Sequence, residues 1–504
     1  MRTKNSFYNF LVSIISGFII PILGFAKVRL FIDLYGSDIN GLYLVFIHII
    51  NYINISEHAF SLAFRQLLYK PLADNDRSLI IKIFSGVRSI YQKIGALMLV
   101  VGFVVALIMP IFIESSLPTG VIIGLFLVLA LPFGLSYFIL PPSLLIIADQ
   151  KEYRISIWIQ LVAIIRMVLM IIVIMLKLPY VIIFVIEGLN VIVGNFVAYK
   201  IAIKNYPWLK VDKSIKTNAD FMKNAKHTLI QRLAFLAINN TDSIIISRFI
   251  NLTAVSVYGA YNYLIEATLR IVHSAITSPI NSFGNLFNSD NEKSYRVFKE
   301  YYEFTLFFAS VLSICIFVVL DQFVYIWMQQ QSYILPLSIS VIFALNVFYL
   351  TQREAIIIIR DANRLFIDAK KNAYLMTLVK ILGSLLLVKA LGITGILLAT
   401  LITYYFIDLA YNPKLVFEKV FKVKPIEYYR VFFVKLVLAI FLSYTFYILY
   451  RSQAVFVTSS LLHFVISLVI LGGSVVLILF IVYYVMFSSF RDLVKRGLKL
   501  LRLR

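Results

Sequence analysis

The segment FIDLYGSDINGLYLVF at residues 31–46 occurs a second time, in altered form, as RFINLTAVSVYGAYNYL at residues 248–264. Without any gap, FIDL followed by GLY in the first copy aligns with FINL followed by GAY in the second, at a constant offset of 218 residues. The next polar segment also repeats after a deletion of two residues, as DNDRS at 74–78 and DNEKS at 290–294. The order and spacing of these matches indicate an internal duplication, so we expect two equivalent halves.

The composition around these segments indicates a membrane protein. Of the 504 residues, 61% are hydrophobic and 14% are charged, whereas soluble globular chains have about 45–50% apolar and about 25% charged residues. The net charge of +22 would favour a nucleic-acid partner in a soluble protein, but a basic binding surface needs a polar domain to carry it. The sequence contains no such domain, so we predict contact with the lipid bilayer and no nucleic-acid partner.

About fourteen apolar stretches are long enough to cross a bilayer, because a spanning helix needs about 20 mainly apolar residues. They lie near 8–32, 40–66, 86–113, 119–147, 153–176 and 179–200, then near 228–250, 256–287, 301–328, 332–352, 368–388 and 392–412, and finally near 428–450 and 459–488. The predicted fold is an all-α integral membrane protein with two six-helix bundles, related by a pseudo-two-fold axis along the membrane normal, and two extra C-terminal helices. The predicted domains are an N-terminal bundle at 1–204, a cytoplasmic linker at 205–227, a C-terminal bundle at 228–413, helices 13 and 14 at 428–488 and a basic cytoplasmic tail at 489–504.

The positions of Lys and Arg predict the orientation, because cytoplasmic loops carry the excess of basic residues. Segments on one side of the predicted membrane carry 33 basic residues, and the opposite loops carry three. Both termini are therefore expected in the cytoplasm. The final segment, RDLVKRGLKLLRLR, is typical of a basic amphipathic helix on an anionic leaflet, and equally of an ordinary positively charged tail.

The sequence has no arrangement of cysteine or histidine residues that is typical of a metal site or a catalytic site. The single cysteine, Cys315, lies in an apolar run, and the five histidines are widely separated without metal-ligand spacing. We predict no metal, no cofactor and no catalytic residues. The N-terminal apolar stretch lacks a small-residue cleavage site, so we expect it to be retained as the first span.

Polar residues within predicted spans are costly in lipid, so they indicate a bundle interior or a hydrated cavity. In the predicted span at 40–66 they recur on one helical face, and the equivalent span at 256–287 carries a second stripe. We interpret the stripes as the lining of a hydrated cavity between the bundles that suits an anionic head group. The candidate substrate-binding residues are Lys27, Arg29, Asn51, Asn54, His58, Arg65, Arg232, Asn239, Arg270 and His273, and the candidate ion-coupling residues are Asp242 and Glu266.

A purely structural interpretation of the same residues stays open. Glu266 and Arg270, at i and i+4, would neutralise each other, while Asn and Ser side chains would join helices by hydrogen bonds. Arg166 and Glu187 are expected to form a structural ion pair. The remaining charged residues within spans, expected to be inter-helix partners or to reach the membrane surface, are Asp321, Lys380, Asp408 and Lys435.

The chain resembles the Wzx-type polysaccharide (O-antigen and capsule repeat-unit) flippases of the multidrug/oligosaccharidyl-lipid/polysaccharide exporter superfamily. The resemblance covers essentially the whole chain and depends on the six plus six plus two arrangement of spans, the opening MRTKN and the two copies of the repeated segment. It implies a multi-pass protein of the bacterial cell membrane that moves an undecaprenyl-pyrophosphate-linked oligosaccharide from the inner to the outer leaflet by alternating access. It also implies that basic cavity residues bind the pyrophosphate, and that other membrane proteins of polysaccharide assembly are partners.

Other functions fit parts of the pattern. A multidrug or small-molecule antiporter would use the same fold but would favour an acidic cavity. A membrane-embedded glycan polymerase would need a large outside loop, and an acyltransferase would need a catalytic His or Ser constellation. A scaffold without transport would bury the polar stripes against partner helices. Transport could be driven by the membrane potential, or by protons or sodium through Asp242 or Glu266.

Overall fold

The computed structural model describes residues 2–211, 240–277, 291–363, 365, 368–452 and 461–502. Within these ranges every regular element is helical, which confirms the predicted all-α class. The chain forms two compact units, Met1–Gly259 and Ala260–Arg504. This division falls within α10, so the first turns of α10 belong to the first unit and the rest to the second.

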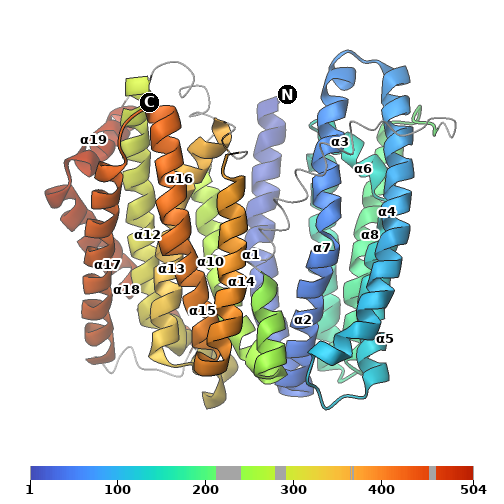
Figure 1. The fold of residues 1–504 in the computed structure, drawn as a ribbon, viewed down its shortest axis with the longest axis horizontal. Coiled ribbons are helices and arrows are strands. Elements are labelled where there is room, and N and C mark those ends of the chain that lie inside the picture. The colour runs from blue at the N-terminus through green and yellow to red at the C-terminus, as the bar shows by residue number, and fades with distance from the viewer. Residues whose placement is uncertain are drawn as a thin grey trace. The chain divides into compact units, whose positions relative to one another are not determined.

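The first unit has eight complete helices among its described residues. Helix α5 contacts both α4 and α8 (Figure 1). The helices are α1 (Arg2–Tyr35), α2 (Ser37–Ile53), α3 (Ile55–Ala73), α4 (Arg77–Phe112), α5 (Thr119–Ser136), α6 (Pro141–Ala148), α7 (Tyr153–Met175) and α8 (Val181–Asn205). The unit also includes a described helical segment at 240–249 and the start of α10 (Leu252–Thr277).

The second unit is built around the long helix α12 (Asn291–Met328), which contacts α13, α17, α18 and α19 (Figure 1). A buried apolar core of aliphatic and aromatic side chains joins α12 to the last three helices. The other elements are η1 (Gln331–Tyr333), α13 (Leu337–Ala362), α14 (Lys370–Leu391), α15 (Ile393–Ile402), η2 (Thr403–Asp408), α16 (Leu409–Val416), η3 (Phe417–Phe421), α17 (Ile426–Ser452), α18 (Leu461–Met486) and α19 (Ser488–Arg502).

Ten segments in the described part of the chain are helical, long and apolar enough to cross a membrane. They coincide with ten of the predicted spans. The positions of the other four predicted spans are compatible with the predicted total of about fourteen. The predicted spans at 8–32 and 40–66 lie on α1 and on α2 with α3, the span at 256–287 lies on α10 as far as Thr277, and the span at 228–250 begins outside the described residues. The ten segments are Arg77–Phe112, Thr119–Ser136, Tyr153–Met175, Val181–Asn205, Ser294–Met328, Leu337–Ala362, Lys370–Leu391, Ile393–Phe421, Ile426–Tyr450 and His463–Met486.

Three predicted spans are interrupted helices, and the span at 40–66 divides into α2 and α3 at Asn54. The predicted span at 119–147 divides into α5 and α6, and Pro141 and Pro142 occupy the start of α6, where a missing N–H is tolerated. The span at 392–412 contains η2, a π-helical segment that ends at Asp408. Such π segments interrupt the regular hydrogen-bond pattern and reorient the side chains that follow.

The two copies of the repeated segment form a close helix contact in which one glycine from each copy takes part. A Cβ atom at Gly41 of α2 would lie 2.0 Å from the carbonyl oxygen of Leu252 at the start of α10, and a Cβ at Gly259 would lie 2.4 Å from Cδ1 of Leu44. Only glycine allows the α2 backbone to approach α10 this closely. Duplication has therefore placed a glycine on each of the two helices that meet.

Polar side chains flank this glycine contact. The Asn40 amide donates to the Ser256 hydroxyl at 2.7 Å, and Thr253 donates to Asp38. Both bonds join α2 to α10, so the repeated segment supplies hydrogen bonds as well as close backbone packing.

Candidate functional site

The most enclosed of the predicted site residues is Lys27 on α1. Its ammonium lies 3.9 Å from the ring centroid of Tyr43 and 5.0 Å from that of Phe31. The Tyr43 hydroxyl donates to Glu187 Oε2 at 2.6 Å, and Arg166 pairs with the other carboxylate oxygen. This confirms the predicted ion pair between Arg166 and Glu187.

We call Lys27, Tyr43, Arg166 and Glu187 the Glu187 cluster. It joins α1, α2, α7 and α8, and it contains two cations for one carboxylate. Lys27 and Glu187 are 4% and 6% exposed. A charged group that is this deeply buried is stable only when it is paired and hydrogen-bonded. We therefore expect the Lys27 ammonium to be used in contacts within the protein.

Two further predicted cations of the first unit, Arg29 and Arg65, lie in the described residues and are more accessible. Arg29 lies one turn before Asp33 on α1, and its Nε pairs with that carboxylate at 2.6 Å. Arg65 on α3 is partly buried, and its Nε makes no hydrogen bond with any residue that the structure describes. Neither side chain is held by a network like that around Glu187.

The predicted asparagines of α2 make inter-helix hydrogen bonds. Asn51 donates to Asn240 at 3.4 Å, and Asn54 accepts from Tyr137 at 2.7 Å. Between them, Tyr52 contacts Thr241. Both asparagines therefore make the kind of hydrogen bond between helices that the structural interpretation expects.

The candidate ion-coupling carboxylate Asp242 is buried, and it accepts a hydrogen bond of 3.0 Å from Tyr258 on α10. Asp242 follows directly after the Asn240 and Thr241 contacts to α2. Three other predicted residues lie beyond what can be described: Arg232 and Asn239 fall outside the described ranges, and so does the side chain of His58.

In the second unit, α10 carries an exposed set of charges. Arg270 pairs with Glu266 at 3.2 Å, with 67% and 50% of their side-chain surfaces exposed. His273 Nε2 lies 3.5 Å from a carboxylate oxygen of Glu354 on α13. The i, i+4 pair expected from the sequence is thus formed, and it leaves most of the guanidinium accessible.

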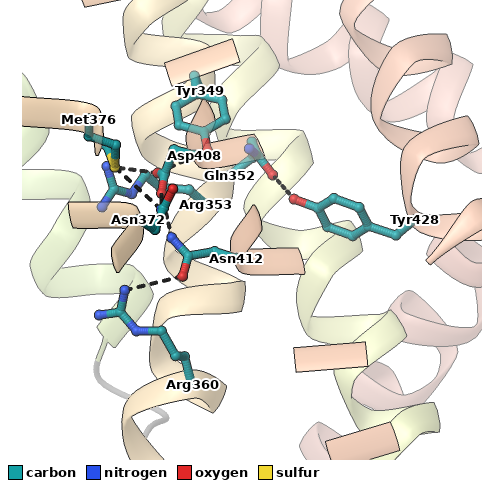
Figure 2. A network of polar contacts seen from close by, with 9 residues as sticks. All are labelled: Tyr349, Gln352, Arg353, Arg360, Asn372, Met376, Asp408, Asn412 and Tyr428. Carbon is teal, nitrogen blue, oxygen red and sulfur yellow. Dashed lines mark hydrogen bonds and ion pairs between the residues drawn. The ribbon is translucent and has the colours of Figure 1, made fainter. Parts of the chain in front are cut away.

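A second buried carboxylate, Asp408, accepts hydrogen bonds from three helices (Figure 2). The Tyr349 hydroxyl donates to Oδ2 at 3.0 Å, and the Asn372 amide donates to Oδ1 at 3.2 Å. Asn412 also donates to Oδ1, and Arg353 lies 3.3 Å from Oδ2. We call these five residues the Asp408 cluster.

The Asp408 cluster continues through a second arginine. Arg360, two turns beyond Arg353 on α13, donates to Asn412 at 3.4 Å (Figure 2). It also pairs with Asp361. Both arginines lie beyond the end of the predicted span at 332–352, whereas the structure places them inside α13. The available signal was Asp408 itself, an acid within an apolar stretch with an asparagine four residues later.

The remaining charged residues within spans are inter-helix partners, as predicted. Lys435 of α17 forms a fully buried pair with Glu303 of α12, and the Lys435 ammonium lies 4.5 Å from the Tyr483 ring centroid. Lys380 donates to the Ile396 carbonyl at 3.3 Å. The Asp321 carboxylate accepts hydrogen bonds from Tyr261 and Ser340.

Comparison with known proteins gives one family match and several structural ones. The family model "Polysaccharide biosynthesis protein" matches residues 73–283, which is less than half of the chain. No curated protein matches.

Solved structures match over most of the chain at low sequence identity. A structure of the lipid II flippase MurJ in an inward closed conformation has 17% identity and a TM-score of 0.71, covering 96% of this chain and 100% of its own. An inward-facing multidrug resistance MATE family transporter has 9% identity and a TM-score of 0.56, covering 79% and 97%. A variant of the Vibrio cholerae MATE transporter VcmN has 12% identity and a TM-score of 0.50, covering 84% and 99%. The chain is therefore a multi-pass membrane protein with the fold of the MurJ and MATE transporters.

Proposed function

We propose that this chain is a flippase that moves an undecaprenyl-pyrophosphate-linked oligosaccharide from the inner to the outer leaflet by alternating access, for surface polysaccharide synthesis. Two comparisons support the proposal. The structure of a lipid II flippase matches 96% of this chain, and the matching family model carries the description "Polysaccharide biosynthesis protein". The proposal includes a bacterial cell membrane location with both termini in the cytoplasm, and other membrane proteins of polysaccharide assembly as partners.

The observation that carries the proposal is the exposed pair Arg270–Glu266 on α10. An ionised side chain that faces hydrocarbon costs at least about 2.5–3.5 kcal/mol, so an exposed pair on α10, which the sequence predicts to lie in a span, needs water around it. An accessible ion pair contributes only about 0–1 kcal/mol. Arg270 can therefore exchange Glu266 for a phosphate at little cost and bind it through two parallel N–H donors.

The same reasoning ranks the predicted cations. Arg29 has an accessible pair with Asp33, and Arg65 is partly open, so we propose both as further contacts to the pyrophosphate. Lys27 is enclosed in the Glu187 cluster, so we propose that it positions α1 and α2 rather than binding substrate. Asn51, Asn54, His58, Arg232, Asn239 and His273 stay proposed as polar groups along the sugar path.

A driving force follows from the charge of the substrate. Moving negative charge outward across a negative-inside potential releases about 2.3 kcal/mol per charge per 100 mV. Ion coupling through Asp242 or Glu266 is the competing mechanism. Transport that persists in the Asp242→Asn/Glu266→Gln double variant would exclude coupling through these carboxylates.

The proposed function is tested by measuring which leaflet holds the lipid-linked oligosaccharide. Deletion of the gene is expected to cause accumulation on the inner leaflet. The wild-type chain should reverse it, and Arg270→Ala should not, because the phosphate then loses its guanidinium partner. Arg248→Ala is the matched control, since Arg248 is also an exposed arginine paired with a carboxylate, Glu114.

Two outcomes would overturn the proposal. One is a deletion strain without accumulation, and the other is full reversal by Arg270→Ala. The MATE likeness favours a multidrug or small-molecule antiporter as the second candidate. For that function, deletion would change drug sensitivity while the distribution of lipid-linked oligosaccharide stayed normal.

A further inference from the structure

A charged groove of about 540 Å³ lies in the second unit where α12 and α19 meet. The two helices are in contact (Figure 1). Four basic and two acidic side chains line the groove, which gives it a net positive charge. The lining residues are Arg296, Lys299 and Glu300 of α12 and Ser489, Asp492, Lys495 and Arg496 of α19.

The α19 wall of the groove is fixed to the protein. Phe490 is buried in the apolar core, with its ring centroid 5.3 Å from that of Phe307. Ser489 donates to Glu303 at 2.8 Å, and Arg496 pairs with Glu300 at 2.8 Å. In the described part of α19, Leu493 and Val494 pack against the apolar core, whereas Lys495 and Arg496 are exposed.

Among the described residues, ion pairing leaves one cation on each wall of the groove, and the carboxylate of Asp492, without a salt bridge. Lys299 pairs with Glu427 at 2.8 Å, and Arg496 with Glu300. Arg296 and Lys495 are exposed, and neither forms an ion pair with any residue in the described ranges. A guanidinium and an ammonium therefore face an accessible space from opposite helices.

The groove lies at the level where two membrane spans end. The candidate span of α12 begins at Ser294, and α18 ends at Met486, directly before α19. Val485 and Met486 are 66% and 62% exposed, so the surface next to the groove along the chain is apolar. A basic site beside an apolar surface at the end of a span matches the level of phospholipid head groups.

We propose that this groove binds the phosphodiester head group of an anionic glycerophospholipid, with Arg296 and Lys495 as its two cationic contacts. Both donors form charge-assisted hydrogen bonds to phosphate oxygens. The acyl chains lie along the exposed apolar end of α18. With the predicted orientation, the lipid belongs to the inner leaflet. This site does not depend on the proposed transport function.

The test uses the full-length protein in a neutral detergent, titrated with dioleoyl-phosphatidylglycerol and observed by native mass spectrometry. Removing both cations in Arg296→Gln/Lys495→Gln is expected to weaken binding about 30-fold, because each basic residue near an anionic lipid contributes about a factor of five. The charge-preserving variant Arg296→Lys/Lys495→Arg should retain binding, which separates loss of charge from loss of fold. Neutral phosphatidylcholine should not be retained.

A matched control removes two exposed lysines from the first unit, Lys70→Gln/Lys82→Gln, and should bind phosphatidylglycerol like the wild type. Equal loss in this control would show diffuse attraction and overturn the site. Competition by glycerol 3-phosphate at concentrations similar to the lipid would identify a free-anion site instead of a lipid site. Equal retention of phosphatidylcholine would also contradict the proposal.

Discussion

The buried carboxylates Glu187 of the first unit and Asp408 of the second both accept from donors on several helices, but the donors differ. Glu187 and Asp408 are 6% and 1% exposed, and each accepts a tyrosine hydroxyl and pairs with an arginine. The Glu187 cluster adds a second cation, Lys27, whereas the Asp408 cluster adds two neutral amides. A buried carboxylate can thus be satisfied by charge or by hydrogen bonds, and the choice decides how much charge remains when the carboxylate is removed.

The largest expected effect is that of Glu187→Gln. It leaves two cations, the buried Lys27 and the partly buried Arg166, without a counter-charge, so the free energy of unfolding should fall by about 3–5 kcal/mol. The measurement is equilibrium unfolding in mixed detergent micelles. The exposed carboxylate Glu114 provides the control, because Glu114→Gln should change stability by only about 0–1 kcal/mol. Equal stability of the two variants would contradict the assignment of the Glu187 cluster.

Asp408→Asn should be the next most damaging substitution, at about 2–3 kcal/mol. Only one cation, Arg353, loses its partner, and 23% of its side chain is exposed, so water compensates part of the loss. The same unfolding assay measures it. A loss greater than that of Glu187→Gln would reverse the ranking and show that the amides, rather than the charges, dominate these clusters.

Removing both charges should distinguish the clusters more sharply. Arg353→Gln/Asp408→Asn leaves no buried ion and should unfold within about 1 kcal/mol of the wild type. Arg166→Gln/Glu187→Gln still leaves Lys27 without a carboxylate, and should stay clearly destabilised. A double-mutant cycle at each site measures how much of the stability lost in Asp408→Asn or Glu187→Gln is regained in the corresponding double variant. Similar recovery at both sites would mean that Lys27 does not depend on Glu187.

The smallest effect is expected for Lys27→Met. It leaves the Arg166–Glu187 pair and the Tyr43 hydrogen bond in place, so stability should change by about 0–1 kcal/mol. The leaflet distribution of lipid-linked oligosaccharide should stay normal, since we propose that Lys27 positions helices. Loss of transport with unchanged stability would instead return Lys27 to the substrate site.

Local patterns in the sequence predicted the features that depend on neighbouring residues. The ten described spans follow from runs of apolar residues, and the pair Glu266–Arg270 follows from its i, i+4 spacing. The Arg166–Glu187 pair was predicted because two opposite charges at similar depth in lipid have few other partners. The repeated segment indicated a glycine on equivalent helices, but not that Gly41 would contact the backbone of Leu252.

The sequence by itself determined that this chain is helical, crosses a membrane and contains a duplicated segment, because periodicity and hydrophobicity are properties of consecutive residues. Only the tertiary structure decided which polar groups meet. Asp408 accepts hydrogen bonds from Asn372 and Tyr349, which lie 36 and 59 positions away in the sequence. Lys435 is paired with Glu303, which lies 132 positions away. Such pairs depend on the rotation and register of packed helices, and these are fixed by the packing of side chains from several helices at once.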